Sequence, residues 1–193
     1  MGDPKFLRRT FERPKHPWEE VRMAEENKLL TKYGLKNKRE LWRAQFRLRN
    51  YRRQARELQA RVRAKEVQAE KETKALLESL VRIGALPVGA NTLDDILSLT
   101  LDSLLERRLQ WIVYVKGLAS TLTGARQLIV HGHISVGNHK VRSPGFVVTR
   151  DDEVKVAYNA YSPFLDEAHP MRVSIKQKIE SGKGAPSAPP ASG

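Results

Sequence analysis

Hydrophobic residues in the first half of the chain recur every three or four positions, which is the spacing of amphipathic helices. A first helix is expected from Pro17, a favoured first-turn residue, to Tyr33, with Gly34 as its stop. The strongest apolar stripe lies in a second helix over residues 37–63, and it consists of Leu41, Ala44, Leu48, Tyr51, Ala55, Leu58 and Val62. A third helix is expected to end at Ile83. The pattern therefore predicts an all-helical first half.

Two motifs of the helix-capping type support these boundaries. Asn37 followed by Glu40 resembles a capping box, in which a polar side chain and an acid three residues later bond each other's backbone N–H groups. Thr92 and Asp95 have the same spacing and predict another short helix. Helix starts are therefore expected at both places.

The hydrophobic spacing changes in the second half. A helix is predicted from Leu101 to Lys116, and Ser120 or Thr121 is expected to cap another. After Gly132 the period shortens to that of strands, with apolar positions at Ile134, Val136, Val141, Phe146, Val147, Val148, Val154 and Val156. Turns are expected between these runs at Gly137-Asn138, Ser143-Pro144-Gly145 and Asp151-Asp152. The second half therefore reads as two helices and a small antiparallel sheet.

Together these patterns predict an α+β fold, in which an N-terminal helical domain precedes a helix–helix–β-ribbon module. The last thirteen residues are Gly, Ala, Pro and Ser with one lysine, a composition too poor in apolar side chains to order itself. The expected division is an extended basic arm (1–16), the helical domain (17–100), the module (101–160), a C-terminal extension (161–180) and a disordered C-terminal tail (181–193).

The composition narrows the functional classes. The 193 residues include no cysteine, which excludes a disulfide framework, a thiolate metal site and a cysteine nucleophile. No apolar run approaches the roughly 20 residues of a membrane helix, and no signal-peptide pattern opens the chain, so we expect a cytoplasmic protein with no membrane partner. The 35 Lys and Arg residues exceed the 22 Asp and Glu residues, a formal charge of +13. Such a surface favours a polyanionic partner, since binding releases counterions from phosphates.

Most of the excess charge lies in residues 35–65, which carry twelve basic and two acidic side chains. A solvated amphipathic face is the alternative, but such faces normally mix both signs. We interpret the second helix as a surface for phosphates, with candidate contacts at Lys38, Arg39, Arg43, Arg47, Arg49, Arg52, Arg53 and Arg56. Trp42 and Phe46 lie one turn apart on the far side, where they contact either a second packing partner or the ligand.

A second basic and polar set lies at the predicted corner between the two later helices and the hairpin. Its members are Arg107, Arg108, Gln110, Thr121, Arg126, Gln127, His131, His133, Lys140 and Arg142. Free amides at the start of the helix capped near Ser120 or Thr121 suit a phosphate. The alternative is that Arg107, Arg108 and Arg126 pair with Glu106 and other acids.

The sequence offers little for catalysis. His131, His133 and His139 form the one candidate metal cluster, but histidines two residues apart at a helix–strand junction rarely converge. No acid lies between Glu106 and Asp151, so phosphate contact or plain loop positions are favoured over a metal site. No serine stands in a nucleophile-elbow context. We therefore expect no enzyme activity, no metal and no cofactor.

The same corner carries a family resemblance. The segments Leu105-Glu106-Arg107-Arg108-Leu109-Gln110, Lys116-Gly117-Leu118-Ala119, Ala125-Arg126-Gln127-Leu128-Ile129 and His131-Gly132-His133-Ile134 resemble the RNA-binding module named after ribosomal protein S4. The run from Tyr33 to Arg43 and the segment Leu80-Val81-Arg82-Ile83-Gly84 resemble the helical domain of that protein in its archaeal–eukaryotic form. The matches cover about residues 5–160.

The resemblance implies a structural protein of the small ribosomal subunit. Such a protein binds small-subunit ribosomal RNA directly, nucleates assembly, contacts neighbouring small-subunit proteins, lies near the messenger RNA entrance and contributes to decoding accuracy. The family's contact positions correspond to Arg107, Arg108, Thr121, Arg126, Gln127, His131 and the ribbon from Lys140 to Arg142. Thr121 is followed by Leu122 where arginine is common, so one phosphate contact differs here.

Two other functions use the same features. An RNA-modifying enzyme, or another RNA-binding factor, carries the same module, but the enzyme needs a β-rich catalytic domain where residues 1–100 read as helical and basic. A membrane-surface protein using the Arg-rich helix leaves the corner at 107–142 unexplained. Some bacterial family members hold zinc through N-terminal cysteines, which this chain lacks.

Overall fold

The computed structural model describes residues 10–87, 89 and 92–180. Their helices are α1 (Glu20–Tyr33), α2 (Lys38–Arg63), α3 (Val67–Ile83), α4 (Leu93–Ser98), α5 (Leu101–Leu105), α6 (Leu109–Val115), α7 (Leu122–Val130), α8 (Arg150–Val154), α9 (Pro170–Glu180) and the short 3-10 helix η1 (Pro163–Leu165). The strands are β1 (Ile134–Val136), β2 (His139–Lys140) and β3 (Val156–Tyr158). The predicted α+β class is confirmed. The first nine residues of the expected basic arm and the whole tail from 181 to 193 lie outside the described residues.

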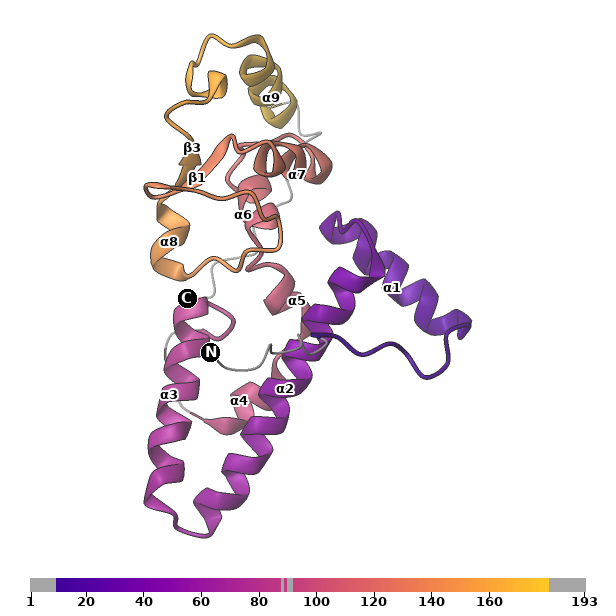
Figure 1. The fold of residues 1–193 in the computed structure, drawn as a ribbon, viewed down its shortest axis with the longest axis vertical. Helices are drawn as coiled ribbons and strands as arrows, with labels where there is room; N and C mark the ends of the chain where they lie inside the picture. Colours follow the sequence, from indigo (N-terminus) through magenta and orange to yellow (C-terminus); the bar gives the residue numbers. More distant parts are fainter. Residues whose placement is uncertain (1–9, 88, 90–91, 181–193) are drawn as a thin grey trace, which may run out of the picture.

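The molecule is elongated, with the helical half at one end and the mixed module at the other (Figure 1). The long helix α2 and α3 form an antiparallel pair, and α4 lies across α2. The predicted stripe of α2 is confirmed, since Leu41, Ala44, Leu48, Ala55 and Leu58 are buried. Each fully buried leucine contributes about 2 kcal/mol by leaving water, so this face holds the helical half together.

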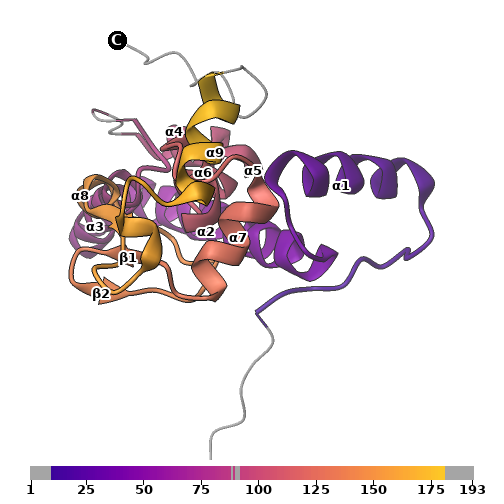
Figure 2. The same cartoon turned by 90° about the horizontal axis from the view of Figure 1, so that it is seen from above.

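Helix α1 stands to one side of the rest, as Figure 2 shows. It ends at Tyr33 with Gly34 in the left-handed conformation (φ 60°), as predicted. It begins at Glu20, three residues later than the sequence predicts. The cause is Arg22, whose guanidinium donates hydrogen bonds to the backbone carbonyls of His16 (2.8 Å) and Pro17 (2.9 Å) and holds them outside the helix.

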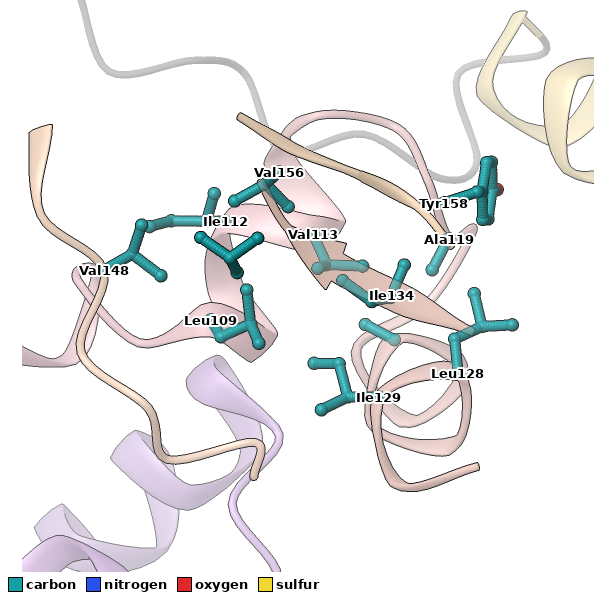
Figure 3. Close-up of a cluster of buried hydrophobic side chains, with 12 residues drawn as sticks. Leu109, Ile112, Val113, Ala119, Leu128, Ile129, Ile134, Val148, Val156 and Tyr158 are labelled. Carbon is teal, nitrogen blue, oxygen red and sulfur yellow. The ribbon is translucent and has the colours of Figure 1, made fainter. Parts of the chain in front are cut away.

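The module forms its own core between α6, α7 and the sheet (Figure 3). The strands are antiparallel in the order β2-β1-β3, with Val136 opposite both His139 and Val156. Alternate residues of β1 face the helices, so Ile134 and Val136 are buried. The predicted small antiparallel sheet is confirmed, and it presents the β1–β2 ribbon beside α7.

The single helix predicted from Leu101 to Lys116 is wrong. It is broken between α5 and α6 because the backbone at residues 107–109 pairs with a distant segment. The Leu109 N–H donates to the Phe146 carbonyl (2.8 Å), and the Val148 N–H donates to the Arg107 carbonyl (2.9 Å). Phe146, Val147 and Val148, which the sequence predicts as a strand, are the partners in this pairing. They form no regular strand and make one isolated β-bridge, between Val147 and Arg108.

The turn predicted at Asp151-Asp152 is also wrong, because these residues lie in α8. Thr149 caps that helix through its side-chain oxygen, which accepts from the Asp152 N–H (3.2 Å). Acidic residues suit the positive end of a helix. Val154, predicted in a strand, ends α8 and is 84% exposed.

Candidate nucleic-acid interface

The basic residues of α2 divide between two faces of the helix. Arg43 and Arg47 line a cavity of about 560 Å³ whose opposite wall includes Arg108 and Ser143. Arg49, Arg52 and Arg56 line a larger cavity of about 1090 Å³, next to the segment 11–15. Arg47 and Arg49 are two positions apart, and residues with that spacing do not share a face of a helix. The basic residues of α2 therefore form two separate surfaces. We call the first cavity the α2 groove.

Some of these cations are held by the protein and others are not. Lys38 pairs with Glu26 (3.3 Å), Arg49 with Glu12, and Arg53 weakly with Glu57 (3.8 Å). Arg52 donates to the Leu99 carbonyl (2.5 Å). Among the described residues no acid pairs with Arg39, Arg43, Arg47 or Arg56, and all four are exposed. Four of the eight predicted contact residues on α2 are therefore left without an acidic or carbonyl partner in the described part of the chain and are available to a polyanion.

Trp42 contacts the protein itself. Its indole N–H donates to the Glu26 carboxylate (3.1 Å), and its ring stacks on Phe11 at 6.2 Å between centroids. Burial alone would raise the pKa of Glu26, but hydrogen bonds from Trp42, Arg22 and Lys38 outweigh it and lower that pKa. Trp42 therefore has packing partners within the protein.

Glu40 joins the two halves of the molecule. Half of the predicted capping box forms, because the Asn37 side chain accepts from the Glu40 N–H (3.2 Å). The Glu40 carboxylate turns instead to the module, where it accepts from Arg108 (2.6 Å) and Arg126 (2.5 Å). All three side chains are largely buried. We call Glu40, Arg108, Arg126 and Gln110 the Glu40 network.

Gln110 completes this network from inside. It is 1% exposed, and its amide donates to the carbonyls of Gly34 (2.8 Å) and Leu122 (3.0 Å). Its oxygen accepts from Arg126 (3.2 Å). Buried amides need such partners. Gln110 therefore ties the turn between α1 and α2 to α7 and is closed off from a ligand.

The charge balance of the network keeps Glu40 ionised. Burial would raise the pKa of the Glu40 carboxyl, but the hydrogen bond from Arg126 and the charges of Arg108 and Arg126 outweigh burial and lower it. Burial lowers the pKa of Arg108, although a guanidinium stays protonated in proteins. The network is therefore one carboxylate between two cations, with a net charge of +1.

A second junction lies at Arg107, whose side chain is 14% exposed. It donates to Glu153 (2.7 Å) in α8 and to the Val148 carbonyl (3.3 Å). Beside it, Arg150 donates to the Leu86 carbonyl (2.5 Å) just after α3. The alternative interpretation, in which the three arginines of the corner pair with acids, is therefore observed. Arg107 pairs with Glu153, and Arg108 and Arg126 pair with Glu40.

The remaining members of the predicted corner lie at the surface. Thr121 caps α7 by accepting from the Gly124 N–H (3.0 Å) and is exposed, as are Gln127, His131, Lys140 and Arg142. His131 bonds Gln127 (3.1 Å). His133 differs, since it bonds the buried Ser162 (2.9 Å) and burial, followed by the charges of His131 and Lys140, lowers its pKa.

The described residues hold no group of three or more His, Asp or Glu side chains suited to a metal ion. The rings of His131 and His133 lie 6.5 Å apart, and His139 is on β2, across the ribbon. None of the described helices combines the length and the apolar character needed to cross a bilayer.

Sequence reasoning missed two parts of this surface. Glu40 was interpreted as a cap alone, because its partners lie 68 and 86 residues away. The loop of Ser143 and Gly145 was interpreted as a turn, although it forms the far wall of the α2 groove. Neither has a local signal, since both depend on how the two halves pack.

A helical half with unpaired arginines, packed against a helix–helix–β-ribbon module, defines an RNA-binding protein of the S4 type. The family model described as S4 domain matches residues 107–154, and the one described as ribosomal protein S4/S9 N-terminal domain matches residues 5–106. The chain belongs to the family of small ribosomal subunit protein uS4.

Curated relatives support this membership over most of the chain. The chain is 49% identical to the small ribosomal subunit protein uS4 of Thermoplasma acidophilum, over 91% of this chain and 87% of the relative. It is 50% identical to the protein of the same name from Picrophilus torridus, over 91% and 95%. The identity to that of Thermoplasma volcanium is 48%, over 95% and 91%.

Proposed function

We propose that this chain binds small-subunit ribosomal RNA through the α2 groove and the corner of α7 and the β1–β2 ribbon. Membership in the uS4 family makes it a structural constituent of the small ribosomal subunit that binds ribosomal RNA, and not an enzyme. No observation favours the alternative of an RNA-modifying enzyme. Our proposal concerns which surfaces make the contact.

The observation that carries the proposal is the α2 groove. Arg43, Arg47 and Arg108 line it together with Glu40, the partner of Arg108. Three cations and one carboxylate therefore meet on one concave surface and leave it a positive charge of two. Structured RNA is read largely by its shape and backbone, and arginine forks match phosphate oxygens. The groove therefore suits a phosphate strand running between the two halves of the protein.

The corner supplies the second contact. Exposed Thr121, Gln127, His131, Lys140 and Arg142 offer hydroxyl, amide and cationic donors, the groups that bind phosphates and sugars. Arg107, Arg126 and His133 are paired within the protein, and we propose that they act by holding the surface and adding to its positive field. Arg108 has both roles: it helps hold the surface by pairing with Glu40, and it lines the α2 groove, where RNA would contact it.

The other face of α2 extends the interface. Arg56 is unpaired among the described residues, and it lines the cavity beside the segment 11–15 together with Arg49 and Arg52. We propose that Arg53 and Arg39, which are exposed on the same helix, add to this cationic surface. We propose that the basic arm at 1–16 follows RNA on this side. Lys38, held by Glu26, adds to the field there.

Further parts of the proposal rest on the family resemblance. We propose that RNA binding by this chain nucleates small-subunit assembly and contributes to decoding accuracy, that the chain lies near the messenger RNA entrance, and that it acts in the cytoplasm. We also propose the division into a helical domain at 17–100, a module at 101–160 and an extension at 161–180. The separate hydrophobic cluster of the module supports it, while Leu105 of α5 packs with the helical half.

Filter binding to small-subunit ribosomal RNA over a range of salt concentrations tests the proposal. If about eight phosphates are contacted, log K should fall with log salt at a slope of about −6 to −7. A fragment of large-subunit RNA of equal length is the control and should bind less tightly. A flat salt response, or equal affinity for both RNAs, contradicts the proposal.

A further inference from the structure

Trp18 is an indole with no packing partner among the described residues. It is 87% exposed, whereas Trp42 and Trp111 are half-buried and pack against other aromatic rings. Burying an indole is strongly favourable, so a tryptophan left in water is costly unless a ligand covers it. No part of the proposed RNA contact above uses this residue.

The backbone that carries Trp18 is fixed in place. Arg22 donates to the carbonyls of His16 (2.8 Å) and Pro17 (2.9 Å), directly before Trp18, and to the Glu26 carboxylate (2.7 Å). Glu26 is 3% exposed and also accepts from Trp42. The backbone directly before the indole is therefore held by hydrogen bonds, so less backbone freedom is lost when the indole binds a ligand.

A cavity of about 560 Å³ lies beside this indole. Trp18 and Trp42 both line it, together with the cations Arg13, Lys38 and Arg39. Arg13 and Arg39 are exposed, and no acid pairs with either among the described residues. The cavity thus combines aromatic surface with a cationic rim, which is the combination that binds an unstacked base and its phosphate.

We propose that this cavity, here called the Trp18 site, holds an unstacked base of ribosomal RNA against Trp18, with Arg13 and Arg39 on the adjoining phosphates. The inference rests on the proposed function and deepens it, because it adds base stacking to contacts made through the backbone. A protein partner is the rival occupant. The unpaired cations at the rim favour RNA, since a neutral apolar partner would leave them without counter-charge.

The test compares Trp18→Ala with Tyr161→Ala in binding to small-subunit ribosomal RNA. Tyr161 is the matched control, because it is an aromatic residue that is 95% exposed and lies in the C-terminal extension. Loss of one stacked base should weaken binding about 5- to 150-fold and leave the salt slope unchanged, since no charge is lost. Trp18→Phe keeps a ring and should recover most of the affinity. Tyr161→Ala should bind like the parent chain.

Quenching by acrylamide reports on the indole directly. RNA should protect the parent chain from quenching, and the protected component should be missing in Trp18→Ala. If the parent chain binds with a steep salt slope but Trp18→Ala binds as tightly as the parent chain, the Trp18 site is overturned and the proposed function stands. If Trp18 is protected only after small-subunit proteins are added, a protein occupies the site and the inference is overturned. Without salt-dependent RNA binding by the parent chain, the proposed function itself fails.

Discussion

Glu40 of α2 and Arg108, directly before α6, form an ion pair of 2.6 Å across the junction of the two halves. Their side chains are 15% and 12% exposed, so the pair is screened little by water. Arg126 of α7 joins the same carboxylate. One acid thus holds two helices of the module against the Arg-rich helix, and it sets the position of the α2 groove between them.

Replacing this acid should destabilise the protein. In Glu40→Gln the cations Arg108 and Arg126 remain largely buried without their counter-charge, and losing one member of such a pair costs about 2–5 kcal/mol. Urea unfolding at pH 7 measures the free energy of unfolding. The matched control is Glu57→Gln, whose exposed pair with Arg53 at 3.8 Å should be worth less than about 0.5 kcal/mol. Equal losses of unfolding free energy in both variants would show that the Glu40 network stabilises the protein no more than an exposed ion pair does.

The same carboxylate predicts a pH dependence. The pKa of Glu40 is lowered from 4.5, so its contribution is fully present above about pH 4.5 and is lost as the pH falls through the lower folded value. The pKa of His133 is lowered from 6.5, so this residue adds a loss of stability that begins as the pH falls below about 6.5. Subtracting the curve of Glu40→Gln from that of the parent chain removes the His133 part. The difference should be constant from pH 7 to 5 and shrink below 4.5; a difference that grows on acidification contradicts the assignment.

Gly34 should tolerate no side chain. It has φ 60°, and a Cβ there would lie 2.6 Å from the Leu122 Cβ of α7. Gly34→Ala should therefore cost the strain of about 1–3 kcal/mol for a left-handed non-glycine residue, plus the clash. Gly137→Ala carries the same strain (φ 58°) with its nearest neighbour at 3.8 Å. Thermal unfolding should give Gly34→Ala a lower melting temperature than Gly137→Ala. The opposite order would show that the contact with α7 relaxes freely.

A charge removed from the α2 groove should change RNA binding and leave the fold intact. Arg47 is exposed and unpaired among the described residues, so Arg47→Ala should weaken binding to small-subunit RNA and reduce the salt slope by about one. The melting temperature should not move. Lys71→Ala on α3 removes an equal charge from an exposed position outside the groove and is the control. Identical effects of the two changes would mean that net charge alone governs binding.

Several features follow from local sequence. The helix limits at Gly34, Asn37 and Ile83 were predicted correctly, because left-handed glycine stops and side-chain caps act within four residues. The apolar stripe of α2 and the capping box of Thr92 were also predicted. The break before Leu109 was not, since the backbone groups that cause it belong to residues 146–148.

By itself, then, the sequence determined the helical half, the small sheet and the excess of positive charge on one helix, because periodicity, caps and charge are properties of neighbouring residues. The tertiary structure alone decided which cations are available. It paired Arg108 and Arg126 with Glu40 and left Arg43 and Arg47 facing the groove. The physical reason is that an ion pair depends on the distance between side chains, and only packing brings residues 68 and 86 positions apart into contact.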